Sequence, residues 1–173
     1  MAGQELATQI RTIPDFPIPG IQFRDITTLL KSSIGLRRAV DAMVEPFLGR
    51  HIDLVVGVES RGFIFATPVA YALNAGFVPV RKMGKLPADA IRVEYELEYG
   101  TNTLELHRDA IAPGQRVLVV DDLLATGGTA AAAVDLVSRL DGVVIGLAFL
   151  VELSDLLGRD RLVGHNVHSV VRY

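Results

Sequence analysis

The stretch from Arg116 to Thr129 constrains the fold of this chain more than any other. Val117 to Val120 form an uninterrupted aliphatic run, which is typical of a strand buried on both faces of a parallel sheet. Two adjacent carboxylates, Asp121 and Asp122, follow this run. A small-residue turn from Ala125 to Thr129 comes next and opens an alanine-rich helix. A strand of this kind needs helices on both faces of its sheet, so the stretch predicts an α/β fold.

The order of these pieces also predicts a chemistry. Ligands of open α/β sheets bind at the carboxyl ends of the strands. A glycine-rich loop at a helix N-terminus directs free N–H groups and the positive end of the helix dipole at a phosphate. Carboxylates beside such a loop can accept hydrogen bonds from sugar hydroxyls, so we expect a ribose phosphate. The loop has neither the lysine of a P-loop nor the Gly-x-Gly-x-x-Gly of a dinucleotide site.

The rest of the chain predicts the same architecture. Strands that alternate with helices indicate a doubly wound, mainly parallel sheet. Pro46 predicts that the helix containing it bends or ends early. No linker or repeat interrupts the sequence, so we expect one domain over residues 1–173. Besides the central strand and the helix from about Thr129 to Leu140, strands are predicted at 52–58, 78–82, 104–106, 143–151 and 167–171, and helices at 2–11, 34–49 and 62–74.

Two segments lack a regular period. The proline-rich run from Ile13 to Gly20 predicts an ordered, extended segment on the surface. Residues Met83 to Asn102 mix charge, aromatic residues, proline and glycine, which is typical of a functional loop. We therefore expect irregular structure there.

The composition excludes several classes of protein. The net charge of −3 argues against a nucleic-acid binder that depends on phosphate contacts. The absence of cysteine excludes disulfides, thiolate catalysis and cysteine zinc sites. The first residues do not resemble a signal peptide, and no apolar stretch is long enough to span a membrane. We expect a cytoplasmic protein with no membrane and no nucleic-acid partner.

Three further strings place polar residues beside predicted strands. Gly57 to Gly62 contains Glu59, Ser60 and Arg61 between a strand and a helix, where small residues let backbone amides approach an anion. The alternative interpretation of this string is an ordinary strand–helix turn with a solvent-facing arginine. The second string is Arg81 to Pro87 with Lys82 and Lys85, and the third is Leu97 to Gly100 with Glu98 and Tyr99. A solvated surface is the alternative for both strings, but a substrate with a 5′-phosphate and a pyrophosphate would require cations such as those of the second string.

Together these motifs resemble a known family. The residues from Val120 to Thr129 are similar to the PRPP (phosphoribosyl pyrophosphate) motif of type I phosphoribosyltransferases. Nearly the whole chain resembles the adenine phosphoribosyltransferases within that group, and only the N-terminus and the residues after Gly158 match loosely. The family's further motifs are found at Pro14 to Gly20, Phe23 to Ile26, Gly57 to Gly62, Arg81 to Pro87, Leu97 to Gly100 and Val151 to Leu153. The resemblance implies a base-binding hood at about 1–35 and a flexible active-site loop at about 83–103.

The resemblance also implies where PRPP binds. Asp121 and Asp122 would hold the ribose 2′ and 3′ hydroxyls, directly or through Mg²⁺, which substrate oxygens and water would largely coordinate. The peptide bond Glu59–Ser60 is expected to be cis. The 5′-phosphate would be bound by Ala125, Thr126, Gly127, Gly128 and Thr129, and the pyrophosphate by Glu59, Ser60, Arg61, Lys82, Lys85 and Tyr99. Lys85 is a candidate for reaching a neighbouring subunit, and Tyr99 could instead position the loop.

Adenine is implied as the base. It would lie between Phe23 and Leu153, with its Watson–Crick edge read by main-chain groups of Gln22 and Arg24. A 6-oxopurine reverses the donor and acceptor there and would leave buried groups unpaired. Relatives that use hypoxanthine or guanine present a lysine after the last main strand, and this chain has no lysine after Lys85.

The implied activity is the transfer of the 5-phosphoribosyl group from PRPP to adenine, giving AMP and pyrophosphate. Glu98 would act at the N7 side of adenine, and Arg61 would meet the charge on the departing pyrophosphate. The alternatives are salvage of a 6-oxopurine on the same scaffold and a PRPP-binding regulator without transferase activity. The resemblance also implies a homodimer.

Overall fold

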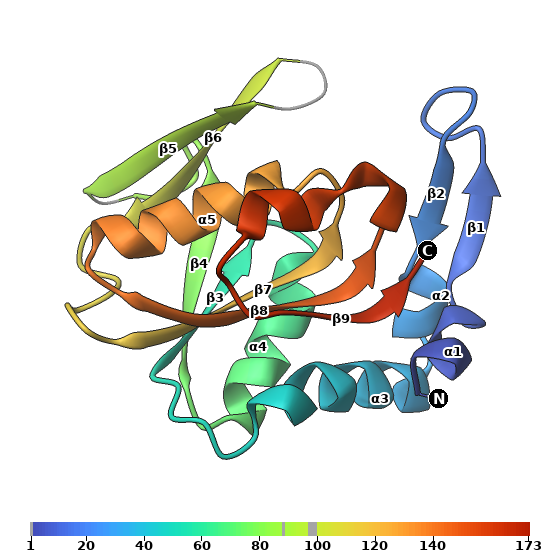
Figure 1. The fold of residues 1–173 in the computed structure, drawn as a ribbon, viewed down its shortest axis with the longest axis horizontal. Helices are drawn as coiled ribbons and strands as arrows, with labels where there is room; N and C mark the ends of the chain where they lie inside the picture. The colour runs from blue at the N-terminus through green and yellow to red at the C-terminus, as the bar shows by residue number, and fades with distance from the viewer. Residues whose placement is uncertain (1, 88, 97–99) are drawn as a thin grey trace.

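A seven-stranded sheet runs through the molecule and carries helices on both faces (Figure 1). The structure is a computed structural model that describes residues 2–87, 89–96 and 100–173. The two edge strands at one side are antiparallel to their neighbours, and the remaining strands are parallel. In spatial order the strands are β5 (Ala90–Glu96), β6 (Thr101–His107), β4 (Gly76–Lys82), β3 (Leu54–Val58), β7 (Arg116–Leu124), β8 (Val143–Glu152) and β9 (Val167–Arg172).

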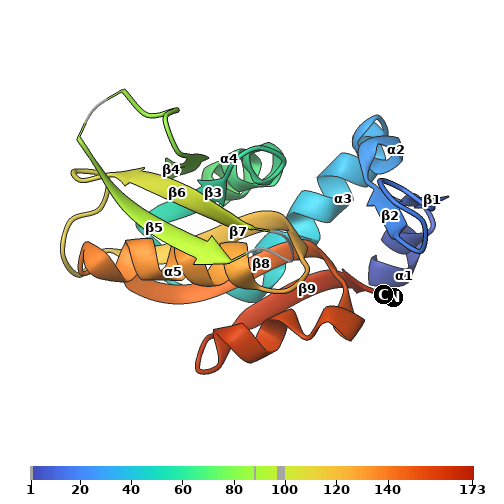
Figure 2. The ribbon, with the colours of Figure 1, turned by 90° about the horizontal axis from the view of Figure 1, so that it is seen from above.

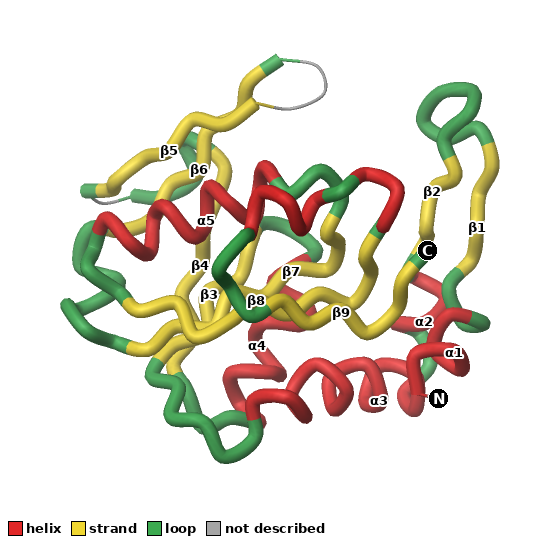
Figure 3. The backbone as a smooth tube through the Cα atoms, in the orientation of Figure 1, coloured by secondary structure: helices red, strands yellow, loops and turns green. Residues whose placement is uncertain are grey.

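Each face of the sheet has its own hydrophobic core. Helices α3 (Ser33–Val44) and α4 (Gly62–Ala72) cover one face, and α5 (Gly128–Arg139) covers the other (Figures 1 and 3). Alternate residues of β7 enter opposite cores: Leu118 packs with α3 and α4, whereas Val117 and Val119 pack with α5. Both sides of this strand are fully buried, which explains its uninterrupted aliphatic sequence. The predicted doubly wound, mainly parallel sheet is confirmed.

Most predicted elements are present with shifted ends. The helix predicted at 34–49 ends at Val44, and Pro46 lies in a short 3₁₀ turn, η1 (Glu45–Phe47). The early end predicted from this proline is therefore confirmed. Two more 3₁₀ turns follow β8, η2 (Ser154–Leu156) and η3 (Gly158–Leu162). None of the helices in the described ranges is long and apolar enough to cross a bilayer.

The expectation of irregular structure from Met83 to Asn102 is wrong for residues 90–96 and 101–102. Residues 90–96 form β5, which pairs antiparallel with β6 from Ala90–His107 to Glu96–Thr101. The sequence does carry a signal for this strand, because Ile91, Val93 and Tyr95 alternate with charged residues. β5 and β6 together form an arm at the edge of the sheet (Figure 2).

The N-terminal residues form a small unit beside β9. Helix α1 (Ala2–Ala7) ends earlier than the predicted Arg11, because Arg11 already belongs to strand β1 (Arg11–Pro14). β1 pairs antiparallel with β2 (Gln22–Asp25), and a short helix α2 (Thr27–Leu30) follows. The proline-rich connection between the two strands is exposed, as predicted, and has a cis peptide bond at Phe16–Pro17.

Asp25 ties this hairpin to α2 and should stabilise the fold in a pH-dependent way. Its buried carboxylate accepts hydrogen bonds from the backbone N–H of Thr27 (2.9 Å), the Thr27 hydroxyl (2.7 Å) and Arg11 Nε (3.0 Å). The bonds from Thr27, and then those from Arg11, lower the pKa of Asp25 from 3.8 to about 2.

Because the folded pKa lies below the unfolded value, this stabilisation is complete above about pH 4 and is lost as the pH falls towards about 2. We therefore expect Asp25→Asn to lower the Tm by several degrees at pH 7 and by about half as much at pH 3. Thermal unfolding followed by circular dichroism at both pH values checks this. Asp109→Asn, at an exposed position, is the control, and an equal Tm difference at both pH values would contradict the prediction.

Candidate active site

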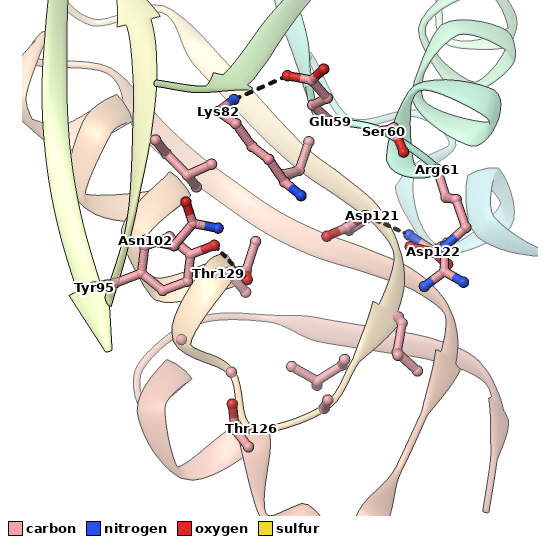
Figure 4. Close-up of a pocket in the computed structure, with 18 residues that line it drawn as sticks. Glu59, Ser60, Arg61, Lys82, Tyr95, Asn102, Asp121, Asp122, Thr126 and Thr129 are labelled. Atoms are coloured by element: carbon pink, nitrogen blue, oxygen red, sulfur yellow. Dashed lines mark hydrogen bonds and ion pairs between the residues drawn. The ribbon is translucent and has the colours of Figure 1, made fainter. Parts of the chain in front are cut away.

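A cavity of about 430 Å³ opens at the carboxyl ends of β3 and β7 (Figure 4). The ends of these two strands, together with the turns that lead from them into α4 and α5, form most of its wall. Lys82 of β4 and the arm of β5 and β6 form the rest. Most of the residues predicted to bind PRPP therefore lie together. They are Glu59, Ser60, Arg61, Lys82, Asp121, Asp122, Ala125, Thr126, Gly127, Gly128 and Thr129.

The phosphate loop, residues 125–129, joins β7 to α5. Gly127 adopts a left-handed conformation with φ of +81° at the N-cap of α5, which suits glycine because it has no Cβ. A Cβ at Gly127 would lie 2.3 Å from the carbonyl oxygen of Gly158, so the loop packs backbone to backbone against η3. The first amides of α5 have no intrahelical acceptor, and the residues that carry them, Gly128 to Ala130, line the cavity. This arrangement can bind a phosphate.

The sequence suggested that Asp121 and Asp122 follow the end of the strand. In the structure they lie within the last residues of β7. The strand continues because Leu123 and Leu124 still pair with β8. Asp122 is 7% exposed, and its Oδ2 lies 2.8 Å from Arg61 Nε. Asp121 Oδ1 accepts a hydrogen bond from the backbone N–H of Asp122 at 2.8 Å.

Burial governs the protonation of both carboxyl groups. It raises the pKa of Asp121 well above its ordinary value, and the negative charge of Asp122 raises it further. Burial also raises the pKa of Asp122, although the Arg61 guanidinium opposes this. Two adjacent carboxyl groups that line a cavity, one buried and one partly buried, favour a hydroxyl donor or a cation as their ligand.

Glu59 holds the two cationic residues at the end of β4, Arg81 and Lys82. Its carboxylate accepts hydrogen bonds from Arg81 Nη2 (3.1 Å) and from the backbone N–H of Lys82 (3.0 Å). The bonds from Arg81 are the main reason why the pKa of Glu59 is lowered. The side chain of Lys82 extends into the cavity (Figure 4), whereas Lys85 is exposed and does not line it. The peptide bond Glu59–Ser60 is cis, as expected.

Two polar cavity residues were missed by the sequence analysis. Tyr95 of β5 and Asn102 of β6 are paired across the arm, and both line the cavity. The Thr129 hydroxyl donates a hydrogen bond to the Tyr95 hydroxyl at 3.3 Å. The alternation that reveals β5 would also have placed Tyr95 on its inner face, but no local signal indicates that this face meets the phosphate loop.

A second, more apolar pocket of about 150 Å³ adjoins the cavity. All four residues predicted to bind the base line it: Gln22, Phe23, Arg24 and Leu153. The two pockets share Arg61, Asp122 and Leu123, so the Arg61–Asp122 ion pair lies at their junction. The ring of Phe23 is met edge-on by Phe16, with 5.2 Å between centroids.

Contacts outside this pocket position its walls. The Arg24 guanidinium stacks 3.7 Å from the ring centroid of Tyr173, and its Nη1 donates to the Thr12 hydroxyl at 2.5 Å. On the opposite side, the backbone N–H of Leu153 donates to the carbonyl of Leu124 at 2.9 Å. The base pocket is therefore fixed both to the N-terminal hairpin and to the end of β7.

The buried carboxylate of Glu152 immediately precedes Leu153. Arg159 binds it with two hydrogen bonds, Nε at 2.7 Å and Nη2 at 2.8 Å, which lower the pKa of Glu152. Because Arg159 follows Gly158, this pair connects the base pocket with the segment that supports the phosphate loop. The predicted residues Glu98 and Tyr99 lie outside the described residues.

The strand, carboxylate pair and glycine loop at the sheet edge define a phosphoribosyltransferase site, and the comparisons with known proteins agree. The family model described as the phosphoribosyl transferase domain matches residues 25–164. An adenine phosphoribosyltransferase of Clostridium perfringens (strain SM101) is 60% identical over 168 residues, covering 97% of this chain and 98% of the relative. The chain therefore belongs to the adenine phosphoribosyltransferase family, as predicted.

Solved structures show the same fold. The adenine phosphoribosyltransferase of Rhodothermus marinus superposes with a TM-score of 0.94 at 54% identity, covering 99% of this chain and 98% of that one. The Saccharomyces cerevisiae enzyme has a TM-score of 0.92 at 40% identity, covering 98% of both chains. That structure was solved in complex with an imino-altritol bisphosphate and adenine.

Proposed function

We propose that this protein transfers the 5-phosphoribosyl group of PRPP to adenine, giving AMP and pyrophosphate. The observation that carries this proposal is the junction of a polar, phosphate-binding cavity with a small apolar pocket at the Arg61–Asp122 pair. A sugar bound over that pair would have its 5′-phosphate in one pocket and its anomeric carbon facing a base in the other. The names of the relatives support the same reaction.

The cavity suits PRPP in its charge and its shape. The amides and hydroxyls of the phosphate loop bind the 5′-phosphate, and the carboxylates of Asp121 and Asp122 accept from the ribose hydroxyls. Ser60, Arg61 and Lys82 surround the pyrophosphate, and Glu59 contributes by fixing Arg81 and the backbone of Lys82. The family resemblance also assigns Tyr99 and Lys85 to the pyrophosphate. Because Lys85 lies outside this cavity, it would act in the site of a neighbouring subunit.

Asp121 and Asp122 also fit a magnesium ion. Mg²⁺ takes oxygen ligands and is commonly held by one or two carboxylates together with substrate phosphates. Among the described residues, no group of three or more acidic or histidine side chains could form a closed metal cage, so substrate oxygens and water would complete the shell. The bound ion would neutralise charge on the pyrophosphate.

Adenine would lie between Phe23 and Leu153. Main-chain groups of Gln22 and Arg24 would pair with its Watson–Crick edge, because the side chain of Arg24 is already engaged by Tyr173 and Thr12. A 6-oxopurine would place an acceptor against the backbone carbonyl and a donor against the N–H, which leaves buried polar groups unpaired. Arg61 would meet the negative charge that develops on the pyrophosphate as the bond to C1 breaks.

The test is a set of parallel reactions with PRPP, Mg²⁺ and one base each: adenine, hypoxanthine, guanine or xanthine. AMP and pyrophosphate from adenine alone are expected. A nucleotide formed from a 6-oxopurine in place of AMP would overturn the assignment of the base. PRPP binding without product from any base would overturn the transferase and favour a regulator that binds PRPP as a ligand.

Glu98 is our proposed catalytic carboxylate. By contacting the N7 side of adenine it would favour the tautomer with N9 free to attack C1, so its loss slows the chemical step. We expect Glu98→Gln to lower kcat by about 10²-fold with a much smaller change in PRPP affinity, as is usual for acid–base groups. Glu94→Gln, an exposed carboxylate of β5, is the control. Unchanged turnover in Glu98→Gln would remove this residue from the mechanism.

The expected homodimer and the expected cytoplasmic location remain predictions from the sequence. Sedimentation at micromolar protein concentration and fractionation of the source cells would test them.

A further inference from the structure

The arm of β5 and β6 meets the phosphate loop through one pair of side-chain hydroxyls. Tyr95 lies on β5, and Thr129 lies in the first turn of α5. The Thr129 hydroxyl donates to the Tyr95 hydroxyl across 3.3 Å, and both side chains line the PRPP cavity (Figure 4). The arm is thus bonded to a residue that we expect to bind the 5′-phosphate.

The backbones approach each other closely at the same point. A Cβ on Gly128 would lie 3.1 Å from the carbonyl oxygen of Glu96 and 3.3 Å from the ring of Tyr95, so only glycine leaves this contact relaxed. Further along α5, Arg139 Nη1 donates to the carbonyl of Arg92 at 3.2 Å. β5 therefore lies along α5 at both places (Figure 2), and the hydroxyl pair is the part of this contact that faces the cavity.

A phosphate bound at Thr129 would reverse the direction of the hydrogen bond between these two hydroxyls. Each hydroxyl has one proton to donate but can accept as well. Phosphate oxygens only accept, so Thr129 would turn its proton to the phosphate and leave its oxygen free to accept from Tyr95. The result is a chain from Tyr95 through Thr129 to the phosphate, in which each bond polarises the next and the last is charge-assisted.

We propose that Tyr95 is a positioning residue of the phosphate site. Through Thr129, it binds the β5–β6 arm more firmly to α5 when the 5′-phosphate is present. This proposal rests on the proposed function, because it assigns the cavity to a sugar phosphate. It adds a role that the family resemblance did not include. Occupancy of the phosphate loop is thereby transmitted to the strand that precedes Glu98 in the sequence.

The test compares Tyr95→Phe, which keeps the ring but removes the hydroxyl, with Tyr71→Phe. Tyr71 is 90% exposed on α4 and offers the same chemical change away from the cavity. We expect Tyr95→Phe to lower kcat/KM for PRPP by about fivefold, which corresponds to one net hydrogen bond, with KM for adenine nearly unchanged. Tyr71→Phe should behave as the wild type.

Hydrogen exchange separates this role from a merely structural one. The probe is ribose 5-phosphate, which carries the 5′-phosphate but no pyrophosphate, added to the whole protein at saturation. In the wild type it should slow amide exchange in β5 and β6 by about fivefold, and in Tyr95→Phe this slowing should be absent although ribose 5-phosphate still binds.

The same slowing in Tyr95→Phe as in the wild type, or no slowing in the wild type with ribose 5-phosphate bound, would overturn the proposal. Because ribose 5-phosphate binding requires no transfer reaction, the exchange result is independent of whether AMP is formed. Failure of the transferase assignment would instead be seen in the reactions with the four bases.

Discussion

Replacing Gly127 by alanine is expected to lower kcat/KM for PRPP by about 10³-fold, the equivalent of losing two hydrogen bonds to a charged group. The φ angle of +81° disfavours any residue with a Cβ. The added Cβ would also lie 2.3 Å from the Gly158 carbonyl oxygen, so the phosphate loop has to move. Displacing the loop misdirects the amides that would hold the 5′-phosphate. Steady-state kinetics with varied PRPP measure the loss.

Gly114→Ala is a matched control for this variant. Gly114 has the same φ of +81°, but no atom lies within 4 Å of the position that its Cβ would take. It therefore reproduces the backbone penalty without the clash, and we expect a small loss of stability with unchanged PRPP kinetics. If Gly127→Ala were as active as Gly114→Ala, the contact with Gly158 would not be required for phosphate binding.

Replacing Asp122 by alanine should lower kcat/KM for PRPP by about 10³-fold as well. The variant removes an acceptor for the ribose and leaves Arg61 without its partner at the junction of the two pockets. Each lost hydrogen bond between a charged group and the substrate costs about 1.5–3 kcal/mol, and Arg61, whose side chain is 41% exposed, also loses the partner that orients it. Because Asp122 lines both pockets, KM for adenine should rise together with KM for PRPP.

The surface pair of Asp135 and Arg139 is the control for this variant. Asp135 lies 2.9 Å from Arg139 within α5, but both side chains are about half exposed, and such pairs contribute little. Asp135→Ala should leave both KM values unchanged. A double-mutant cycle with Arg61→Ala should show strong non-additivity. Additive effects would contradict the idea that Arg61 and Asp122 act as a pair.

Local sequence patterns were sufficient to predict the centre of the fold. The aliphatic run before Asp121 can only be buried between two helical layers, and the glycine-rich turn has to begin a helix. These are short-range constraints, so the strand, the loop and the helix could all be placed before the structure was known. The ends were less accurate, because pairing with β8 extends β7 through both aspartates to Leu124.

Strand β5 shows where local patterns fail. Its alternation of apolar and charged residues is visible in the sequence, but nearby prolines, glycines and charges obscured it. The strand is stabilised by antiparallel pairing with β6, which the local sequence does not reveal. Tyr95 was missed for the same reason. Nothing near it in the sequence indicates that it lies against Thr129, which is 34 residues away.

The sequence by itself determined the class of sheet and the strand, glycine-rich turn and helix around Asp121, because each depends on neighbours in the chain. The residues of the base pocket were expected only from the family resemblance. Only the tertiary structure decided that Gln22, Phe23 and Arg24 face Leu153, and that Arg61 pairs with Asp122 where the pockets meet. It also decided that Glu59 binds Arg81, and that Lys85 lies outside the cavity. These contacts join segments far apart in the chain, and their geometry is set by the packing of whole strands and helices rather than by any local preference.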